Sequence, residues 1–360
     1  MNYSESILDR ICIRDNHSLE EQIANEYNEF IKGYVIDRNA EYPDPEYLIE
    51  IGGVPTMPKG NLIAVSAKWK NGKTFFCDIL SAIFLGSDQF ASCRSLQQAG
   101  RVLFFDTEQA KSDTKRIQET IDKMTPESRH HDYDVYCLRN MNIDRTGEDS
   151  DEITRYEFIS QTIAYDKPDL VIIDGIADLL YNYNDVIESQ RLVNRLAAIA
   201  NEHNCAIVVV MHQNKGFNDK NMKGHLGTML YQKCSDVFSV EKCGGIFVVR
   251  NTISRHQPCG DFVFKLTADG VPEDGKAERQ QKEGELWVML VSAVPEDGTP
   301  AKRSEVAEHL VEMYPFKRAK AYQLLNDFVK RGWLIEVDRS TVKLNPQNRQ
   351  IDQQTKRQVG

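Results

Sequence analysis

Directly after an apolar run, the chain carries the segment Ala67-Lys68-Trp69-Lys70-Asn71-Gly72-Lys73-Thr74-Phe75. Glycine, lysine and threonine in this order suit a phosphate chain: backbone N–H groups wrap a phosphate, the lysine reaches its outer oxygens, and the hydroxyl faces Mg²⁺. Ala67 stands where such a loop usually begins with glycine, and a methyl group is tolerated there if the backbone keeps a negative φ. The segment therefore predicts a binding site for a nucleoside triphosphate with Mg²⁺.

The flanking sequence has the order of strand, loop and helix that this motif requires. Residues 62–65 predict a buried strand, and the apolar residues after the loop recur at helical spacing: Phe76, Ile79, Leu80, Ile83 and Phe84. A glycine turn beside a solvated lysine is the alternative explanation. The flanking order favours the phosphate site.

Acidic residues at the ends of other apolar runs are candidates for metal binding and catalysis. Asp174 ends the run 170–174 and would hold Mg²⁺ through water, with helix capping as its alternative role. Glu108 follows the run 101–105, where a carboxylate can orient and deprotonate the water that attacks the terminal phosphate. Asp106 competes for that role, and either carboxylate would also serve as a helix cap.

Polar residues follow the strand predicted at 205–211. His212 and Gln213 would touch the terminal phosphate and transmit its loss to the loop beyond, with a solvated strand end as the alternative. The next segment, 215–228, is rich in glycine, lysine and asparagine. Lys215, Lys220 and Lys223 suit contact with single-stranded DNA phosphates, and an ordinary surface loop is the alternative.

Two arginines lie around a hairpin predicted at 246–249 and 262–266. From such a hairpin, Arg250 or Arg255 would reach the γ-phosphate held by a neighbouring subunit. A surface ion pair is the alternative role for each.

Strands and helices alternate through the middle of the chain, which predicts an α/β fold with a doubly wound, mostly parallel sheet. We expect an N-terminal helical or assembly segment at residues 1–45, with a helix at 19–33, and a nucleotide-binding domain at 46–268. A polar linker is expected at 269–284, a small second domain at 285–345 and a disordered tail at 346–360.

Three predicted helices and a strand pair make up the small C-terminal domain. The helices cover residues 285–294, 304–314 and 317–331, and the strands cover 333–337 and 341–344. This order predicts a winged helix. Lys317, Arg318 and Lys320 open its third helix and suit DNA contact, although winged helices also dock proteins.

The composition is that of an ordinary soluble protein, with 41% hydrophobic and 27% charged residues. No run approaches the roughly 20 apolar residues of a membrane span, and the N-terminus lacks the features of a signal peptide. Eight scattered cysteines without a CxxC pair argue against zinc and against a disulfide framework. We therefore expect a cytoplasmic protein. The net charge of −10 argues against a generally basic coat but allows a local basic cleft for DNA.

These motifs resemble those of the RecA-like P-loop ATPases, specifically the RepA/DnaB-type hexameric helicase branch and the RepA-like AAA proteins of plasmids and mobile elements. The resemblance covers about residues 45–270 and rests on residues 67–74, 104–109, 170–174, 212–215 and 224–228. It implies a RecA-like domain at 46–268 that hydrolyses ATP with Mg²⁺. It also implies a homo-oligomer, a hexameric ring, that associates with DNA.

Carried over by position, the resemblance assigns a role to each candidate. Lys73 and Thr74 hold phosphate and metal, and Asp174 holds the metal. Glu108 is the catalytic glutamate and His212 the sensor, while Arg255 matches the position of an arginine finger. The chain departs from the pattern at Ala67, in the expanded stretch 216–223, and around Arg255, where the usual lysine-x-arginine pair is missing.

Three functions compete on this sequence. The first is an ATP-hydrolysing, DNA-associated motor or replication ATPase. The second is a nucleotide-switched DNA- or protein-binding regulator with slow hydrolysis. The third is a small-molecule kinase, but the sequence lacks the lid of clustered arginines expected of such an enzyme.

Overall fold

The continuous apolar runs of the sequence form one nine-stranded sheet in the order β12-β11-β10-β9-β3-β8-β7-β5-β6. Six strands run parallel: β3 (Leu62–Ala67), β5 (Val102–Asp106), β6 (Tyr133–Cys137), β7 (Leu170–Asp174), β8 (Ala206–His212) and β9 (Asp236–Cys243). The antiparallel strands are β10 (Ile246–Ser254), β11 (Phe262–Leu266) and β12 (Pro272–Asp274). The predicted α/β class with a mostly parallel sheet is thus confirmed, as is the late hairpin.

This computed structural model describes residues 19–32, 34–143, 153–214, 219–295, 297–345 and 347. By internal contacts the chain divides into two units, Met1–Pro45 and Glu46–Gly360. The shorter unit contains helix α2 (Leu19–Lys32), close to the predicted range. The tail predicted at 346–360 lies outside the described residues, apart from residue 347. Within the described ranges, no helix has the length and apolar character needed to cross a membrane.

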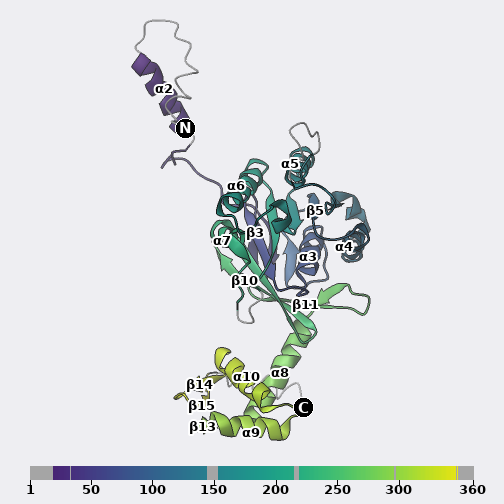
Figure 1. Ribbon diagram of the computed structural model, residues 1–360, viewed down its shortest axis with the longest axis vertical. Coiled ribbons are helices and arrows are strands. Elements are labelled where there is room, and N and C mark those ends of the chain that lie inside the picture. Colours follow the sequence, from purple (N-terminus) through teal and green to yellow (C-terminus); the bar gives the residue numbers. More distant parts are fainter. Residues whose placement is uncertain are drawn as a thin grey trace. The chain divides into compact units, whose positions relative to one another are not determined.

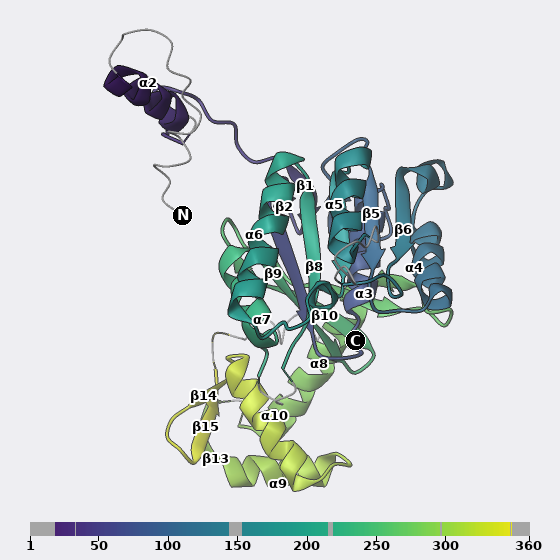
Figure 2. The ribbon, with the colours of Figure 1, turned by 45° about the horizontal axis from the view of Figure 1, so that its top comes forward.

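Helices cover both faces of the large sheet (Figures 1 and 2). One face carries α3 (Lys73–Phe84) and α4 (Lys111–Met124), and the other carries α5 (Arg155–Asp166), α6 (Val186–Glu202) and α7 (Gly224–Lys233). Successive strand residues point to opposite faces, so Ile63 and Val65 join one hydrophobic core while Leu62 and Ala64 join the other. Two short 3-10 helices, Glu127–Asp132 and Ile176–Leu179, lie between these elements.

A second, three-stranded sheet combines two strands that precede the phosphate-binding segment with one that follows α3. It has the order β2-β1-β4, formed by β1 (Tyr47–Ile51), β2 (Val54–Pro58) and β4 (Cys93–Ser95). Leu48 and Ile49 of β1 belong to the same core as α3. This sheet therefore supports the helix that follows the phosphate-binding loop.

The C-terminal part contains α8 (Lys276–Ala293), α9 (Arg303–Met313), α10 (Arg318–Lys330) and a three-stranded sheet in the order β13-β15-β14. The strands are β13 (Ala301–Lys302), β14 (Leu334–Glu336) and β15 (Thr341–Leu344). Its core includes Trp287 and Trp333, whose rings meet edge to face at 5.4 Å. The strand pair predicted at 333–337 and 341–344 is present, and β13 adds a third strand to it.

Residues 269–284 do not form the polar linker that the sequence predicts. In the structure they contain β12 and the first turns of α8, which begins at Lys276. The polar residues there are mostly strong helix formers, alanine, glutamate, arginine, glutamine and lysine, so high polarity marked an exposed helix and not a loop.

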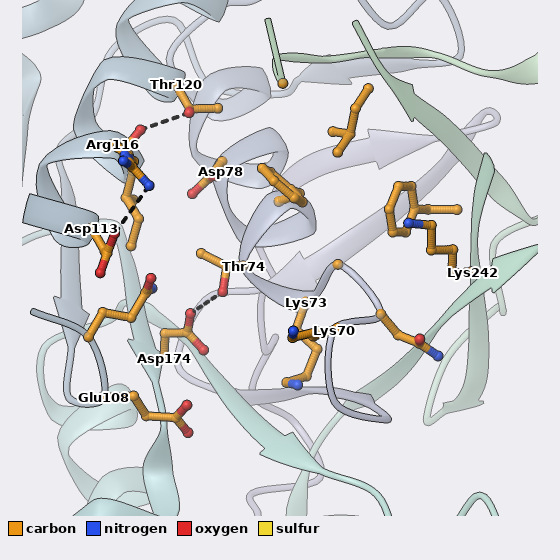
Figure 3. A pocket seen from close by; sticks show the side chains of 18 of the residues that line it. Lys70, Lys73, Thr74, Asp78, Glu108, Asp113, Arg116, Thr120, Asp174 and Lys242 are labelled. Carbon is orange, nitrogen blue, oxygen red and sulfur yellow. Dashed lines mark hydrogen bonds and ion pairs between the residues drawn. The ribbon is translucent and has the colours of Figure 1, made fainter. Parts of the chain in front are cut away.

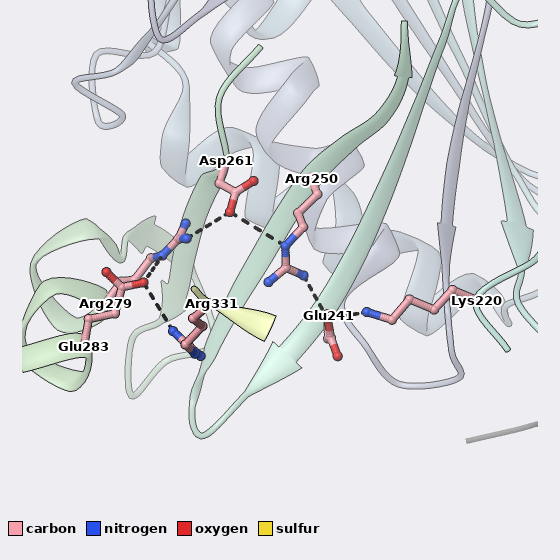
Figure 4. A network of polar contacts seen from close by, with 7 residues as sticks. All are labelled: Lys220, Glu241, Arg250, Asp261, Arg279, Glu283 and Arg331. Carbon is pink, nitrogen blue, oxygen red and sulfur yellow. Dashed lines mark hydrogen bonds and ion pairs between the residues drawn. The ribbon is translucent and has the colours of Figure 1, made fainter. Parts of the chain in front are cut away.

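A series of alternating charges connects the large sheet to the C-terminal helices (Figure 4). Glu241 on β9 accepts from Arg250 at 2.8 Å, and Glu283 on α8 lies 3.8 Å from Arg331 at the end of α10. The series consists of Lys220, Glu241, Arg250, Asp261, Arg279, Glu283 and Arg331.

Candidate active site

The phosphate-binding segment joins β3 to α3. Ala67 ends β3, pairs with His212 and Val240 on the neighbouring strands, and has no positive φ, which meets the condition that the sequence set. Gly72 has a φ of 80°, and a Cβ atom on it would lie 2.6 Å from the Phe247 ring. Glycine is therefore required at residue 72, both for its conformation and for the close approach of Phe247.

A pocket of about 820 Å³ opens beside this loop (Figure 3). That volume is in the range of small-molecule sites, roughly 300–1,000 Å³. The loop from Trp69 to Phe75 lines it, whereas Ala67 and Lys68 precede the lining. Residues from other parts of the chain also line it, among them Asp78, Glu108, Asp113, Arg116, Asp174, His212, Lys242, Phe247 and Leu266.

Thr74 and Asp174 meet at the pocket wall. The Thr74 hydroxyl donates to Asp174 Oδ2 at 2.6 Å. Burial raises the pKa of Asp174 to about 6, and the Thr74 hydrogen bond acts in the opposite direction. The strand-end acid therefore lies beside the loop hydroxyl, as a shared metal site requires.

His212 lies between the loop lysine and a carboxylate. Lys73 Nζ is 3.1 Å from His212 Nδ1, and His212 Nε2 is 3.6 Å from Glu108 Oε1. Because an ammonium group only donates, Nδ1 accepts and Nε2 carries the proton that faces Glu108. The hydrogen bond from His212 lowers the pKa of Glu108, while burial lowers the pKa of Lys73.

Asp106, the last residue of β5, and Glu108, two residues later, occupy different environments. Asp106 is fully buried and accepts three hydrogen bonds, from the N–H groups of Glu108 and Gln109 and from the Thr114 hydroxyl. Glu108 lines the pocket with a side chain that is 44% exposed. The structure thus gives Asp106 a role in ordering the start of α4 and leaves Glu108 facing the pocket.

Gly175, which the sequence interpretation passed over, lets the Glu108 segment approach the end of β7. Its φ is 104°, and a Cβ atom would lie 2.2 Å from Thr107 Oγ1 and 2.9 Å from Glu108 Cγ. Thr107 Oγ1 is 2.9 Å from the carbonyl oxygens of both Asp174 and Gly175. A glycine directly after a strand-end acid was the signal available in the sequence.

Asp78 is a second residue that the sequence interpretation missed. It lies on α3, is 1% exposed, and its pKa is raised well above the usual range by burial and by the negative charges of Asp174 and Asp106. The signal was an acid in an otherwise apolar helix, one turn after Thr74.

The basic residues predicted to contact DNA are dispersed. Lys215 lies outside the described residues. Lys220 pairs with Glu241 at 3.1 Å, and Lys223, which precedes α7, lies close enough to influence the pKa values of Lys73 and Glu108.

The basic residues of the C-terminal part that were predicted to contact DNA lie at the start of α10. Lys317 precedes the helix, and Arg318 pairs with Glu308 at 3.0 Å. Lys320 lines a second pocket of about 940 Å³, bordered by residues of β9, β10, α8 and α10.

Arg255 does not line the active-site pocket. Its guanidinium donates to the carbonyl oxygens of Gln232 and Lys233, at 3.0 and 3.1 Å, at the end of α7. A cation is favourable at a helix C-terminus. The arginine-finger role therefore stays a prediction.

The residues at the pocket fit Mg²⁺ bound together with a nucleotide. Among the described residues, no group of three or more histidine, cysteine, aspartate or glutamate side chains could hold a metal ion by itself. Mg²⁺ in nucleotide sites takes one or two protein oxygens and completes its shell with phosphates and water. Thr74 and Asp174 are suited to that arrangement.

Comparison with known proteins identifies the family. A family model described as an AAA domain matches residues 29–217, which include the phosphate-binding loop, Glu108, Asp174 and His212. No curated protein matches the chain. A solved structure, "Crystal structure of the RadB recombinase", matches with 18% identity and a TM-score of 0.41, over 61% of this chain and 93% of its own. Because the family model matches more than half of its residues, this chain belongs to the AAA-domain family.

Proposed function

We propose that this protein hydrolyses ATP and couples hydrolysis to DNA, as a motor or a replication or mobilisation ATPase resembling the RepA-like hexameric helicases. The observation that carries the proposal is the arrangement at one pocket of Lys73, Thr74, Glu108, Asp174 and His212. These side chains are of the kinds that phosphoryl transfer to water requires: groups that bind the phosphates, residues that bind the metal ion and a group that positions the attacking water.

Each residue has a task that follows from its contacts. The loop N–H groups and Lys73 hold the phosphate chain, and Thr74 with Asp174 holds Mg²⁺. The bound metal neutralises charge on the phosphate oxygens. Glu108, ionised at neutral pH and facing the pocket, orients the attacking water and accepts its proton. Positioning and electrostatics supply most of the rate enhancement.

His212 is suited to sense the terminal phosphate. It contacts Lys73 and Glu108 together, so a phosphate that engages Lys73 competes for the Nδ1 hydrogen bond. His212 ends β8, and the backbone N–H of Lys223 donates to the His212 carbonyl at 3.0 Å. A change at His212 therefore reaches the segment that contains Lys220 and Lys223.

DNA contact and assembly complete the proposal. Residues 46–268 act as the RecA-like ATPase domain and 285–345 as a winged helix, and α8 begins directly after β12 of the large sheet. Lys317 and Lys320 at the start of α10 contact DNA, and the segment of the sequence with Lys215, Lys220 and Lys223 contacts a single strand. Residues 1–45 assist assembly into a ring in the cytoplasm, and Arg255 would act on a neighbouring subunit's nucleotide.

A nucleotide-switched binding protein is the second candidate. The observation that favours it is the pairing of Lys220 with Glu241 and of Arg318 with Glu308, which reduces the positive charge free for DNA. A motor unwinds forked DNA with ATP, whereas a switch does not. Unwinding by the wild type that disappears in Lys73→Ala supports the motor. DNA binding without unwinding in any nucleotide state contradicts it.

A further inference from the structure

Asp78 lies in the wall of the active-site pocket, and the proposed chemistry gives it no task. Its side chain is 1% exposed, and its Oδ1 atom has no hydrogen-bond partner among the described residues. The neighbouring carboxylates differ: Asp106 accepts three hydrogen bonds and Asp174 accepts one from Thr74. Because buried polar atoms are almost always bonded, a free oxygen in a pocket wall indicates a group that binds there from solvent.

The position of Asp78 points to the metal side of the pocket. Asp78 and Thr74 are one helical turn apart, so both lie on the same face of α3. Helical side chains lean toward the N-terminus, which brings the Asp78 carboxyl over the turn that carries Thr74. Figure 3 shows Asp78, Thr74 and Asp174 following one another along one side of the pocket.

The charges around Asp78 suit a cation. Asp174 and Asp106 are the charged groups that act on it, and both are acidic. No lysine or arginine of the described ranges forms an ion pair with Asp78, and the nearby Arg116 pairs with Asp113 at 3.3 Å. A bound divalent cation is the largest local charge in such a site and favours ionised carboxylates around it.

We propose that Asp78 is a further carboxylate of the magnesium site, and that its carboxyl group accepts a hydrogen bond from a water molecule bound to Mg²⁺. Mg²⁺ dehydrates reluctantly and keeps several waters in nucleotide sites, so a carboxylate can act on it through water. The inference rests on the proposed nucleotide function. It makes Asp78 a positioning residue that distinguishes the magnesium–nucleotide complex from the nucleotide alone.

The test is calorimetric binding of ADP with Mg²⁺ and with EDTA, for the wild type, Asp78→Asn and Asp78→Leu. Both variants should bind Mg²⁺–ADP about tenfold more weakly, the usual effect of losing an outer-shell partner of a metal. Their affinity for metal-free ADP should match that of the wild type. The melting temperature of Asp78→Leu without ligand should equal or exceed that of the wild type, because the unsatisfied carboxyl is gone.

The matched control is Ser81→Ala, on the same helix. Ser81 is fully buried and donates to the Cys77 carbonyl, outside the pocket lining. It should leave both ADP affinities unchanged.

Three outcomes overturn the proposal. Equal weakening with and without Mg²⁺ means that Asp78 contacts the nucleotide itself. Unchanged affinities, or a lower melting temperature in both Asp78 variants, mean that its role is structural. Lys73→Ala distinguishes failure of this inference from failure of the proposed function. If Lys73→Ala still binds ADP, or if the wild type does not bind it, the proposed nucleotide site itself is wrong.

Discussion

At the scale of single residues, the two neighbouring carboxylates Asp106 and Glu108 differ in what they contact. Asp106 is committed to the backbone and Thr114, whereas Glu108 contacts His212 and the pocket. Replacing Glu108 with Gln should preserve nucleotide binding and lower turnover by at least about 100-fold, the usual contribution of a general base. Steady-state hydrolysis and ADP affinity would be measured together.

Asp106→Asn is the control for that substitution. It should retain turnover while lowering the free energy of unfolding by about 1–3 kcal/mol, because buried donors lose a carboxylate acceptor. If Asp106→Asn removes turnover and Glu108→Gln keeps it, Asp106 is the catalytic base and Glu108 is not.

The raised pKa of Asp174 predicts a pH dependence of stability without ligand. The folded pKa of about 6 exceeds the ordinary 3.8, so between these values the folded chain holds a proton that the unfolded chain has lost. Stability therefore falls as pH rises from about 4 to about 6, by about 3 kcal/mol from this group. Urea titrations at both ends of this range should show the fall in the wild type. An equal fall in Asp174→Asn would show that other groups cause it.

The sequence predicted residues that the structure brings together at one pocket, and missed those whose position matters because of packing. Lys73, Thr74, Glu108, Asp174 and His212 follow apolar strands, and parallel strands bring their carboxyl ends to one edge. The missed residues, Asp78 and Gly175, matter because of burial and close approach, which exist only once distant segments have packed.

At the scale of elements, the turn after β7 positions the Glu108 segment. Gly175→Ala introduces a Cβ atom 2.9 Å from Glu108 Cγ. A displacement of about 1 Å in a catalytic group costs on the order of 100-fold in rate, so turnover should fall by that order. Nucleotide affinity should change far less. The variant would be compared with the wild type in kcat and in ADP binding.

Gly86→Ala is a matched control for backbone strain. Gly86 also has a positive φ, of 94°, but a Cβ atom there would meet nothing within 4 Å. Each substitution places a side chain in a left-handed conformation at about 1–2 kcal/mol. Equal loss of turnover in the two variants would mean that strain alone, and not the contact with Glu108, limits the rate.

The order of elements was predictable because strands of continuous apolar residues alternate with amphipathic helices. The first turns of α8 were not, because their polar residues satisfy both a linker and an exposed helix. Only the packing of Trp287, Leu290 and Ala293 further along the helix distinguishes the two. The short strand β13 was also missed, since a strand at Ala301–Lys302 has no pattern of its own.

At the scale of the whole molecule, the proposed function couples ATP hydrolysis to DNA through basic residues that lie far from the pocket residues in the sequence. Substituting both Lys317 and Lys320 with Ala should weaken DNA binding and leave basal hydrolysis unchanged. Each lost phosphate contact should reduce the slope of log affinity against log salt by about 0.7–0.9. Affinity would be measured over a series of salt concentrations.

The matched control replaces Lys111 and Lys115 of α4 with Ala; both are also exposed and lie on a helix that covers the large sheet. Its salt slope should equal that of the wild type. If the Lys317 and Lys320 variant also keeps the wild-type slope, the C-terminal part does not contact DNA and is a protein-docking domain.

The measurement that tests the central claim most directly is steady-state ATP hydrolysis with and without single-stranded DNA, at one low salt concentration, for the wild type beside Glu108→Gln. The account predicts several-fold stimulation by DNA in the wild type and its loss in the variant. Slow hydrolysis by the wild type that does not respond to DNA would contradict a DNA-coupled ATPase and favour the nucleotide-switched binding protein.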